Sequence, residues 1–257
     1  MKRTLIIVLC LTGLAFGINK TYRRPQANTV GLIAHYKLWD GLMTTGKVFD
    51  YALNGHGGAL KDTNTPITLV PTWPGFDFDG SNDYIEIADH NDFSPGDGST
   101  GTPFSISAWV YMHNATYFVW ASKWQVGSNQ EWNIFTGTQK KIHFRMYDDS
   151  ENAYIGRQYN ASLASYENQW THFVLTYDGG ILSSGFRIHL NGVRVDDADS
   201  ESGNFISVEN LLQPVWIGRY DTKYANGLFD NVMFFNVELS VIEVKNIYEL
   251  SRWRYQR

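Results

Sequence analysis

The chain has 257 residues, of which 43% are hydrophobic, 15% aromatic and 18% charged. This length allows a full core, and all-β domains of about 200 to 250 residues are commonly single domains. The formal net charge of −5 argues against nucleic acid and anionic membranes as main partners. The many aromatic and glycine residues favour strands and tight turns over a helical bundle.

The first 17 residues have the pattern of a secretory signal peptide. Lys2 and Arg3 give a basic start, residues 5–16 are mostly apolar, and small residues surround a cleavage site near Gly17. The apolar run is shorter than the roughly 20 residues of a membrane-spanning helix, and no later stretch is long enough. We therefore expect a secreted or periplasmic protein without membrane insertion. Cys10, the only cysteine, lies in this segment, so we expect no disulfide.

The rest of the chain divides into three parts. Residues 18–28 are polar and basic and indicate a linker. Residues 29–250 carry regular strand patterns without repeats and indicate one domain, and residues 251–257 form a basic tail that we expect to be solvated.

Alternation of apolar and polar residues predicts strands at 31–38, 104–112, 117–124, 131–136, 141–147, 170–177 and 215–220. The strand at 104–112 has bulk on both faces and is predicted to be central. Residues 148–168 are polar and give no strand signal. Short strands spaced by about 8 to 12 residues, with turns between them, predict a sandwich of two sheets.

Two segments predict hairpins. In residues 76–87, alternating stretches flank an Asp79-Gly80 turn. In residues 186–196, Asn191-Gly192 favours a type I′ turn and a register that pairs Leu190 with Val193.

The segment 227–250 predicts a strand followed by a helix. In the strand 227–235, strict alternation places Asp230 among apolar residues, on one face with Leu228 and Val232. Ser240 and Glu243 have the spacing of a capping box, so we expect the helix to start at Ser240.

Eight stretches in this order resemble the concanavalin A-like lectin/glucanase superfamily, specifically its laminin-G-like jelly roll. They are GLIAHYKLWD, DYALNGHGGAL, FDFDGSNDYIEI, FSISAWVYM, WTHFVLTYDGG, FRIHLNGVRV, VWIGRY and GLFDNVMFFNVELSVIEVKNIYEL. The resemblance implies an all-β, two-sheet antiparallel jelly-roll sandwich with one short C-terminal helix. It also implies binding sites on a concave face or on the loop rim.

The resemblance further implies a structural calcium ion at the rim. The matching positions are Asp50 and Asn54, in a glycine-bordered loop, and Asp230 on the closing strand. Oxygen ligands suit calcium, and a carboxylate on an apolar face needs a partner. The alternative is that Asp50 is a turn residue and that Asp230 accepts hydrogen bonds.

Ligand-binding residues are predicted in two clusters of aromatic and polar side chains. The segment VWASKWQVGSNQEW contains three tryptophans, of which Trp120 and Trp132 occupy expected core positions while Trp124 is the surface candidate. The predicted ligand-binding residues are Trp124, Gln125, Asn129 and Gln130 in this segment, and Tyr220 and Tyr224 in a second cluster.

Catalytic motifs are missing from the sequence. The Glu-x-Asp-x-x-Glu strand of hydrolases with this fold is absent, as is a Gly-x-Ser-x-Gly elbow. The seven histidines show no pair at metal-ligand spacing. The sequence thus favours a non-catalytic module that binds a glycan or glycoprotein. The alternatives are a protein-interaction or adhesin subunit of a cell surface or virion, and a polysaccharide hydrolase or lyase with a diverged site.

Overall fold

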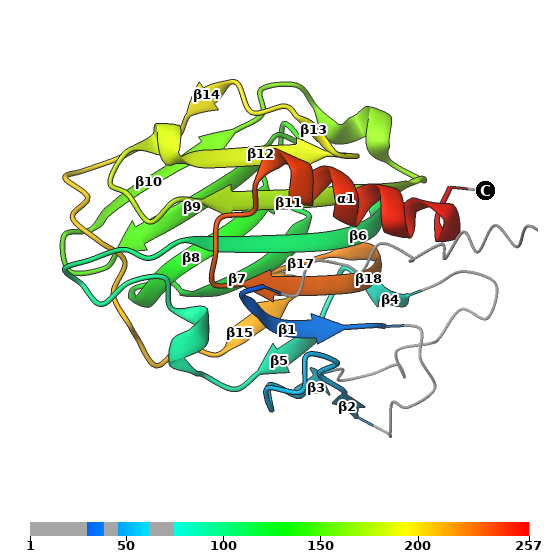
Figure 1. Ribbon diagram of the computed structural model, residues 1–257, viewed down its shortest axis with the longest axis horizontal. Helices are drawn as coiled ribbons and strands as arrows, with labels where there is room; N and C mark the ends of the chain where they lie inside the picture. Colours follow the sequence, from blue (N-terminus) through cyan, green and yellow to red (C-terminus); the bar gives the residue numbers. More distant parts are fainter. Residues whose placement is uncertain (1–29, 39–45, 62–74, 257) are drawn as a thin grey trace, which may run out of the picture.

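The computed structural model describes residues 30–38, 46–61 and 75–256. The predicted signal peptide and linker lie outside these residues. Strands in two antiparallel sheets dominate the structure, as predicted, with one α-helix near the C-terminus (Figure 1).

The first sheet has seven strands in the order β1-β18-β6-β11-β12-β13, with β4 also paired to β18. Its strands are β1 (Leu32–Tyr36), β4 (Phe76–Asp79), β6 (Phe104–Asn114), β11 (Trp170–Tyr177), β12 (Phe186–Leu190), β13 (Val193–Arg194) and β18 (Asn226–Phe235).

The second sheet has nine strands in the order β14-β10-β9-β8-β7-β15-β5-β3-β2. Its strands are β2 (Lys47–Val48), β3 (Gly58–Lys61), β5 (Tyr84–Ile87), β7 (Val119–Gln125), β8 (Ser128–Thr136), β9 (Ile142–Asp148), β10 (Ala153–Gln158), β14 (Ala198–Asp199) and β15 (Val215–Ile217). The remaining elements are the strand pair β16 (Arg219–Tyr220) and β17 (Lys223–Tyr224), the helix α1 (Val241–Ser251), and the 3-10 turns η1 (Asn91–Phe93), η2 (Leu163–Tyr166), η3 (Ser183–Gly185) and η4 (Arg252–Arg254).

The main core lies between the two sheets. The central strand β6 directs Phe104, Ile106 and Val110 into it, and β9 contributes Phe144 and Met146 from the opposite sheet. Each large apolar side chain buried in this way stabilises the fold by roughly 1.5–3 kcal/mol. The predicted central position of β6 is confirmed, because it is paired with β18 on one side and β11 on the other.

The helix α1 lies across the seven-stranded sheet, on the side away from the nine-stranded sheet (Figure 1). Its capping box is confirmed: Ser240 Oγ accepts from the Glu243 N–H at 3.3 Å, and Glu243 Oε2 accepts from the Ser240 N–H at 2.8 Å. Val244 and Ile247 bury the helix against Met233 of β18. None of the helices in the described residues is long and apolar enough to cross a membrane.

A bulge in β18 corrects the predicted faces of this strand. The pairing with β6 shifts between Asp230 and Met233, and Asn231 has a positive φ of 51°. The extra residue reverses the alternation. Val232 therefore points into the main core, whereas Leu228 lies on the opposite face with the aromatic side chains beneath the C-terminus. The prediction that these two residues share a face was wrong.

Two other predictions are corrected and one is confirmed. Residues 76–87 form no hairpin, because β4 pairs with β18 in the first sheet and β5 pairs with β3 and β15 in the second. The strand β10 was missed, since Ala153 and Gly156 leave its apolar pattern weak. The hairpin of β12 and β13 has the predicted register, with Leu190 opposite Val193 and positive φ at Asn191 and Gly192.

The C-terminal tail is packed at Tyr255, whereas Arg252, Trp253 and Gln256 are exposed. Tyr255 is buried and stacks on Trp109 with ring centroids 4.2 Å apart. It also contacts Trp170 at 5.0 Å. The folded domain therefore includes residues that the sequence analysis assigned to a free tail.

Candidate functional site

The outer face of the nine-stranded sheet, directed away from the core, carries aromatic side chains. Along β9, Phe144 and Met146 point into the core, so the alternating residues Arg145 and Tyr147 lie on the outer face. Similarly, Trp216 lies between two core residues of β15. In the described residues, no α-helix covers this face, since α1 lies over the other sheet (Figure 1).

Five aromatic side chains and one arginine form a continuous contact network that we call the aromatic band: Trp124, Phe135, Arg145, Tyr147, Tyr154 and, from the adjoining β16, Tyr220. Tyr220 is central, with its ring 4.5 Å from Trp124 and stacked on Phe135 at 5.0 Å. The Arg145 guanidinium lies 4.5 Å from the ring of Tyr154 and 5.3 Å from that of Phe135. The band thus combines flat apolar surface with one fixed cation.

Electrostatics within the band are set by burial. Burial raises the pKa of the Tyr220 hydroxyl, which therefore stays protonated. Burial, together with Arg145 and Lys141, lowers the pKa of the neighbouring His143 to about 4. At neutral pH His143 is therefore uncharged, and Arg145 is the cation of the band.

Two buried polar atoms beneath the band have no hydrogen-bond partner among the described residues. They are Nε1 of Trp124 and Oδ1 of Asn133. The amide nitrogen of Asn133 donates to the Tyr147 hydroxyl at 3.2 Å. Because buried polar groups in native proteins are usually satisfied, the two unpaired atoms indicate a place for buried water.

A second aromatic group lies on β5 and β15 of this sheet and on the adjoining strand pair β16 and β17. The Arg219 guanidinium stacks over Trp216 at 3.9 Å, and also faces Tyr84 at 4.7 Å and Tyr224 at 5.6 Å. Glu86 accepts from Trp216 Nε1 at 3.3 Å. Both groups therefore pair an arginine with aromatic rings.

The structure brings the two predicted ligand-binding clusters together on this face. Trp124 and Tyr220 are in contact, and Gln130 is paired with Trp124 across β7 and β8. Gln125 is exposed, whereas Asn129 donates its N–H to Asp149 Oδ2 at 3.2 Å. Tyr224 lies beside Arg219.

The expected surface position of Trp124 is corrected, while the expected core positions of Trp120 and Trp132 are confirmed. Trp124 is only 6% exposed, because Tyr147 and Tyr220 cover its ring. Trp120 and Trp132 lie in the core. Sequence reasoning missed Phe135, Arg145, Tyr147 and Tyr154. Their alternation with core residues along β8, β9 and β10 is the signal that could have found them.

The residues proposed for calcium do not fit a calcium site. Oδ1 of Asp50 accepts the N–H groups of His35 and Ala52 at 3.0 and 2.8 Å, and Oδ2 accepts those of Asn54 and His56, both at 3.2 Å. The Asn54 amide nitrogen donates to the carbonyls of Leu32 and Ile33. Because four N–H groups already surround the Asp50 carboxylate, a cation would have to displace them.

Asp230 is likewise held by hydrogen-bond donors. Its Oδ1 accepts the N–H groups of Leu38 and Asn231 at 2.8 and 2.7 Å, and its Oδ2 accepts the Tyr255 hydroxyl at 2.6 Å. Burial raises the pKa of Asp230, although the Tyr255 hydroxyl and the nearby Arg254 act in the opposite direction. Asp230 therefore accepts hydrogen bonds, which was the alternative to calcium binding, and it links β18 to the C-terminus.

The acidic residues near this face also have structural contacts. Glu131 and Lys123 form a fully buried ion pair, which Asp89 joins with an oxygen 2.8 Å from Lys123 Nζ. Asp148 accepts the N–H groups of Glu151 and Ile206 at 3.1 and 2.9 Å. These ion pairs and hydrogen bonds give the acidic residues structural roles.

A family model described as the concanavalin A-like lectin/glucanases superfamily matches residues 79–245. This range covers more than half of the chain, and the two-sheet sandwich agrees with it. The chain belongs to this superfamily. No curated protein sequence matches the chain.

Solved structures with a similar fold include bacterial toxin binding domains. The binding domain of Paraclostridial Mosquitocidal Protein 1 has a TM-score of 0.59 and 15% identity, covering 85% of this chain and 52% of that chain. The ligand-binding domain of botulinum neurotoxin serotype D, in complex with N-acetylneuraminic acid, has a TM-score of 0.59 and 15% identity, covering 87% of this chain and 52% of that chain. The botulinum neurotoxin DC binding domain, in complex with rat synaptotagmin II, has a TM-score of 0.59 and 14% identity, covering 85% of this chain and 51% of that chain. The chain spans about half the length of these structures, and the similarity shows the fold alone.

Proposed function

We propose that the protein is a non-catalytic binding module that recognises carbohydrate through the outer face of its nine-stranded sheet. The observation that carries this proposal is the aromatic band, in which Trp124, Phe135 and Tyr220 form a connected surface beside the Arg145 guanidinium. The predicted signal peptide supports a setting outside the cell.

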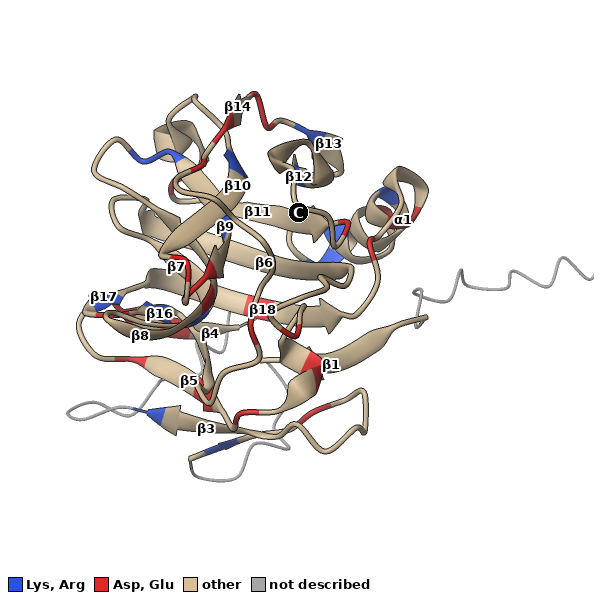
Figure 2. Cartoon of the chain, turned by 90° about the vertical axis from the view of Figure 1, so that its left-hand side faces the viewer, with Lys and Arg blue, Asp and Glu red and all other residues tan. Residues whose placement is uncertain are grey.

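The chemistry of the band suits a sugar ring. The C–H faces of a sugar pack on aromatic rings, and its hydroxyl groups need polar partners. Arg145 and Gln130 lie beside the rings and can supply such partners. Acidic and basic residues are otherwise interspersed along the described chain in the view of Figure 2, without a continuous basic stripe.

A protein partner is the second candidate. Aromatic residues and arginine are also the residue types that dominate protein-binding hot spots. The two stacked arginines, Arg145 and Arg219, favour this candidate as much as a glycan. Two of the similar structures are complexes, one with N-acetylneuraminic acid and one with rat synaptotagmin II, so a glycan component and a protein are each bound by proteins that share this fold over about half of their length.

A glycan array distinguishes the two candidates. We expect the tag-free chain without residues 1–17 to bind a defined set of glycans, and to bind them equally with and without a chelator, since hydrogen-bond donors already surround the Asp50 and Asp230 carboxylates. Failure on every glycan, combined with capture of glycoproteins that survives enzymatic deglycosylation, would support the protein-binding alternative. Release of reducing sugar from mixed polysaccharides would instead support a hydrolase.

A further inference from the structure

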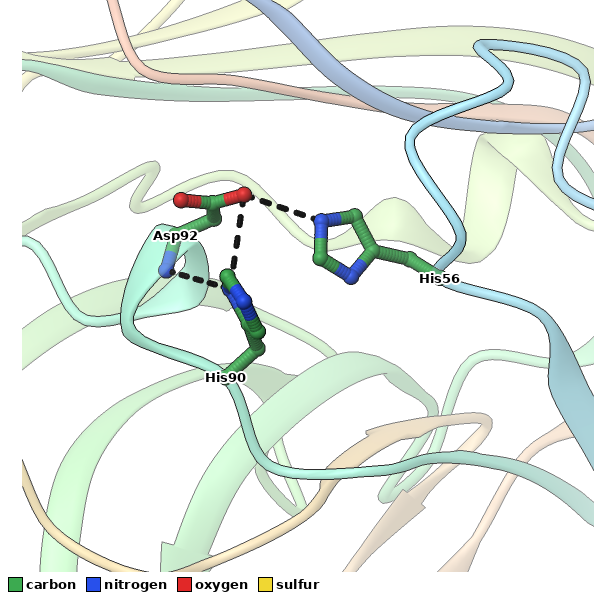
Figure 3. Close-up of side chains that lie close together, drawn as sticks. All are labelled: His56, His90 and Asp92. Carbon is green, nitrogen blue, oxygen red and sulfur yellow. Dashed lines mark hydrogen bonds and ion pairs between the residues drawn. The ribbon is translucent and has the colours of Figure 1, made fainter.

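Three side chains that can bind a metal converge at the edge of the sandwich, away from the aromatic band. They are His56, His90 and Asp92, and one nitrogen or oxygen atom of each lies within 4.8 Å of the others (Figure 3). His56 comes from the loop before β3, whereas His90 and Asp92 flank the start of η1. In Figure 3 both imidazole rings are directed toward the Asp92 carboxylate.

The backbone holds His56 in place. Its N–H donates to Asp50 Oδ2 at 3.2 Å, and its carbonyl accepts the Tyr36 hydroxyl at 2.6 Å. The ring is buried and lies edge-on to Phe93, with centroids 4.9 Å apart. The Asp50 loop therefore presents a rigid ring nitrogen, Nε2, which lies 2.9 Å from Asp92 Oδ2.

One oxygen of Asp92 faces a ring nitrogen of each histidine. Nδ1 of His90 accepts the Asp92 N–H at 3.2 Å, so it carries a lone pair and no proton. The same Nδ1 lies 3.4 Å from Asp92 Oδ2, which also carries only lone pairs when ionised. Both atoms are acceptors, and a metal ion bound between them would take over the Nδ1 lone pair that now accepts the Asp92 N–H.

We propose that His56 Nε2, His90 Nδ1 and an Asp92 oxygen bind a divalent transition metal of the zinc type. Zinc takes imidazole nitrogen and carboxylate oxygen at about 2.0–2.2 Å, and two histidines with one carboxylate are a known three-ligand set. The two separations from Asp92 Oδ2, 2.9 and 3.4 Å, approach the roughly 3.3 Å expected between tetrahedral ligands at those distances, and the two histidine atoms lie within 4.8 Å of each other.

The fourth coordination position of the proposed site opens to solvent. The side chains of His90 and Asp92 are 54% and 45% exposed, whereas His56 forms the buried wall. A bound metal would connect the Asp50 loop to η1 and hence β3 to the segment after β5. Sequence spacing could not find this site, because 34 positions separate the two histidines and the sheet alone brings them together.

Isothermal titration of the tag-free chain with zinc chloride tests the proposal. We expect one equivalent to bind, and H90Q or D92N to weaken binding at least tenfold. These two exposed positions are preferable to His56, whose replacement threatens folding. At a hundredfold excess over Kd, zinc should raise Tm by about 5 °C or more in the unmodified chain, and much less in either variant.

The matched control is H113Q. His113 Nε2 lies 3.0 Å from Asp77 Oδ1, a histidine–aspartate pair with no third ligand among the described residues. We expect zinc binding in H113Q to equal that of the unmodified chain. The proposal is overturned if the chain does not bind zinc, or if H90Q and D92N bind it as tightly as H113Q does.

Discussion

The hydroxyl of Tyr255 donates a 2.6 Å hydrogen bond to Oδ2 of Asp230, which joins the C-terminus to the bulge of β18. Asp230 is fully buried, and its other oxygen accepts the N–H of Leu38, two residues after β1. One carboxylate therefore connects the first strand, the closing strand and the C-terminal residues.

Removing the Tyr255 hydroxyl should destabilise the fold. Y255F keeps the stacking of the ring on Trp109 but leaves Asp230 Oδ2 without its closest donor. We expect a loss of about 1–3 kcal/mol in the free energy of unfolding, the usual cost of an unsatisfied buried acceptor. Guanidinium denaturation followed by tryptophan fluorescence measures this loss.

Y248F is the matched control for Y255F. Tyr248 also packs on Trp109, but its hydroxyl contacts Gln256 at 3.0 Å in an exposed position. We expect a change within about 0.5 kcal/mol. Equal losses in Y248F and Y255F would show that the hydrogen bond to Asp230 contributes nothing specific.

The buried His172 should make stability fall in acid. Complete burial, with His189 nearby, lowers the pKa of His172 to about 3. Below pH 6.5 the unfolded chain gains a proton that the folded chain excludes, so stability is full above pH 6.5 and is lost as the pH falls toward 3. We expect His172 to account for a loss of about 2 kcal/mol between pH 7 and pH 5.

Denaturation of H172Q at both pH values checks this assignment. The absolute stability of the variant is not the criterion, since Gln changes the contact with Ser107. The loss between pH 7 and pH 5 should shrink by about 2 kcal/mol, leaving the contribution of the other histidines whose pKa burial lowers, His35, His143 and His189, which has the same sign. An unchanged pH dependence of stability in H172Q would contradict the assignment to His172.

Calcium should leave the stability of the protein unchanged. The Asp50 carboxylate already accepts four backbone N–H groups, and Asp230 is held by donors on both oxygens. We expect millimolar calcium or EDTA to change Tm by less than about 1 °C. A rise of several degrees in calcium that is lost in D50N or D230N would refute this reading of both carboxylates.

Much of the fold follows from local sequence, because local signals specify local structure. The faces of β6, the Asn191-Gly192 hairpin and the Ser240 capping box each depend on residues close in sequence, and each was predicted. The bulge at Asn231 was not, since a single extra residue changes the face of every later side chain without altering composition.

The candidate sites were harder to predict because they depend on distant segments. Trp124 is covered by Tyr220, which is far away in sequence and reaches it only through the pairing of β7 with β15. Asp79 to Asp83 look like a hairpin turn, yet they carry the chain from one sheet to the other. Alternation identifies which side chains point away from the core, but not which of them contact each other.

The central claim concerns the aromatic band, and Tyr220 is its most accessible test. Tyr220 is half-buried at the centre of the band and joins Trp124 to Phe135, so Y220A removes contact surface with less disturbance than loss of the buried Trp124. W253A is the control, because Trp253 is 66% exposed on η4 and far from the band in sequence.

Isothermal titration with the best glycan from the array therefore provides the most direct measurement. We predict that Y220A weakens binding about tenfold or more, as loss of a central aromatic contact does, while W253A and the unmodified chain have the same Kd. Equal affinity of Y220A and W253A for that glycan would contradict recognition through the aromatic band.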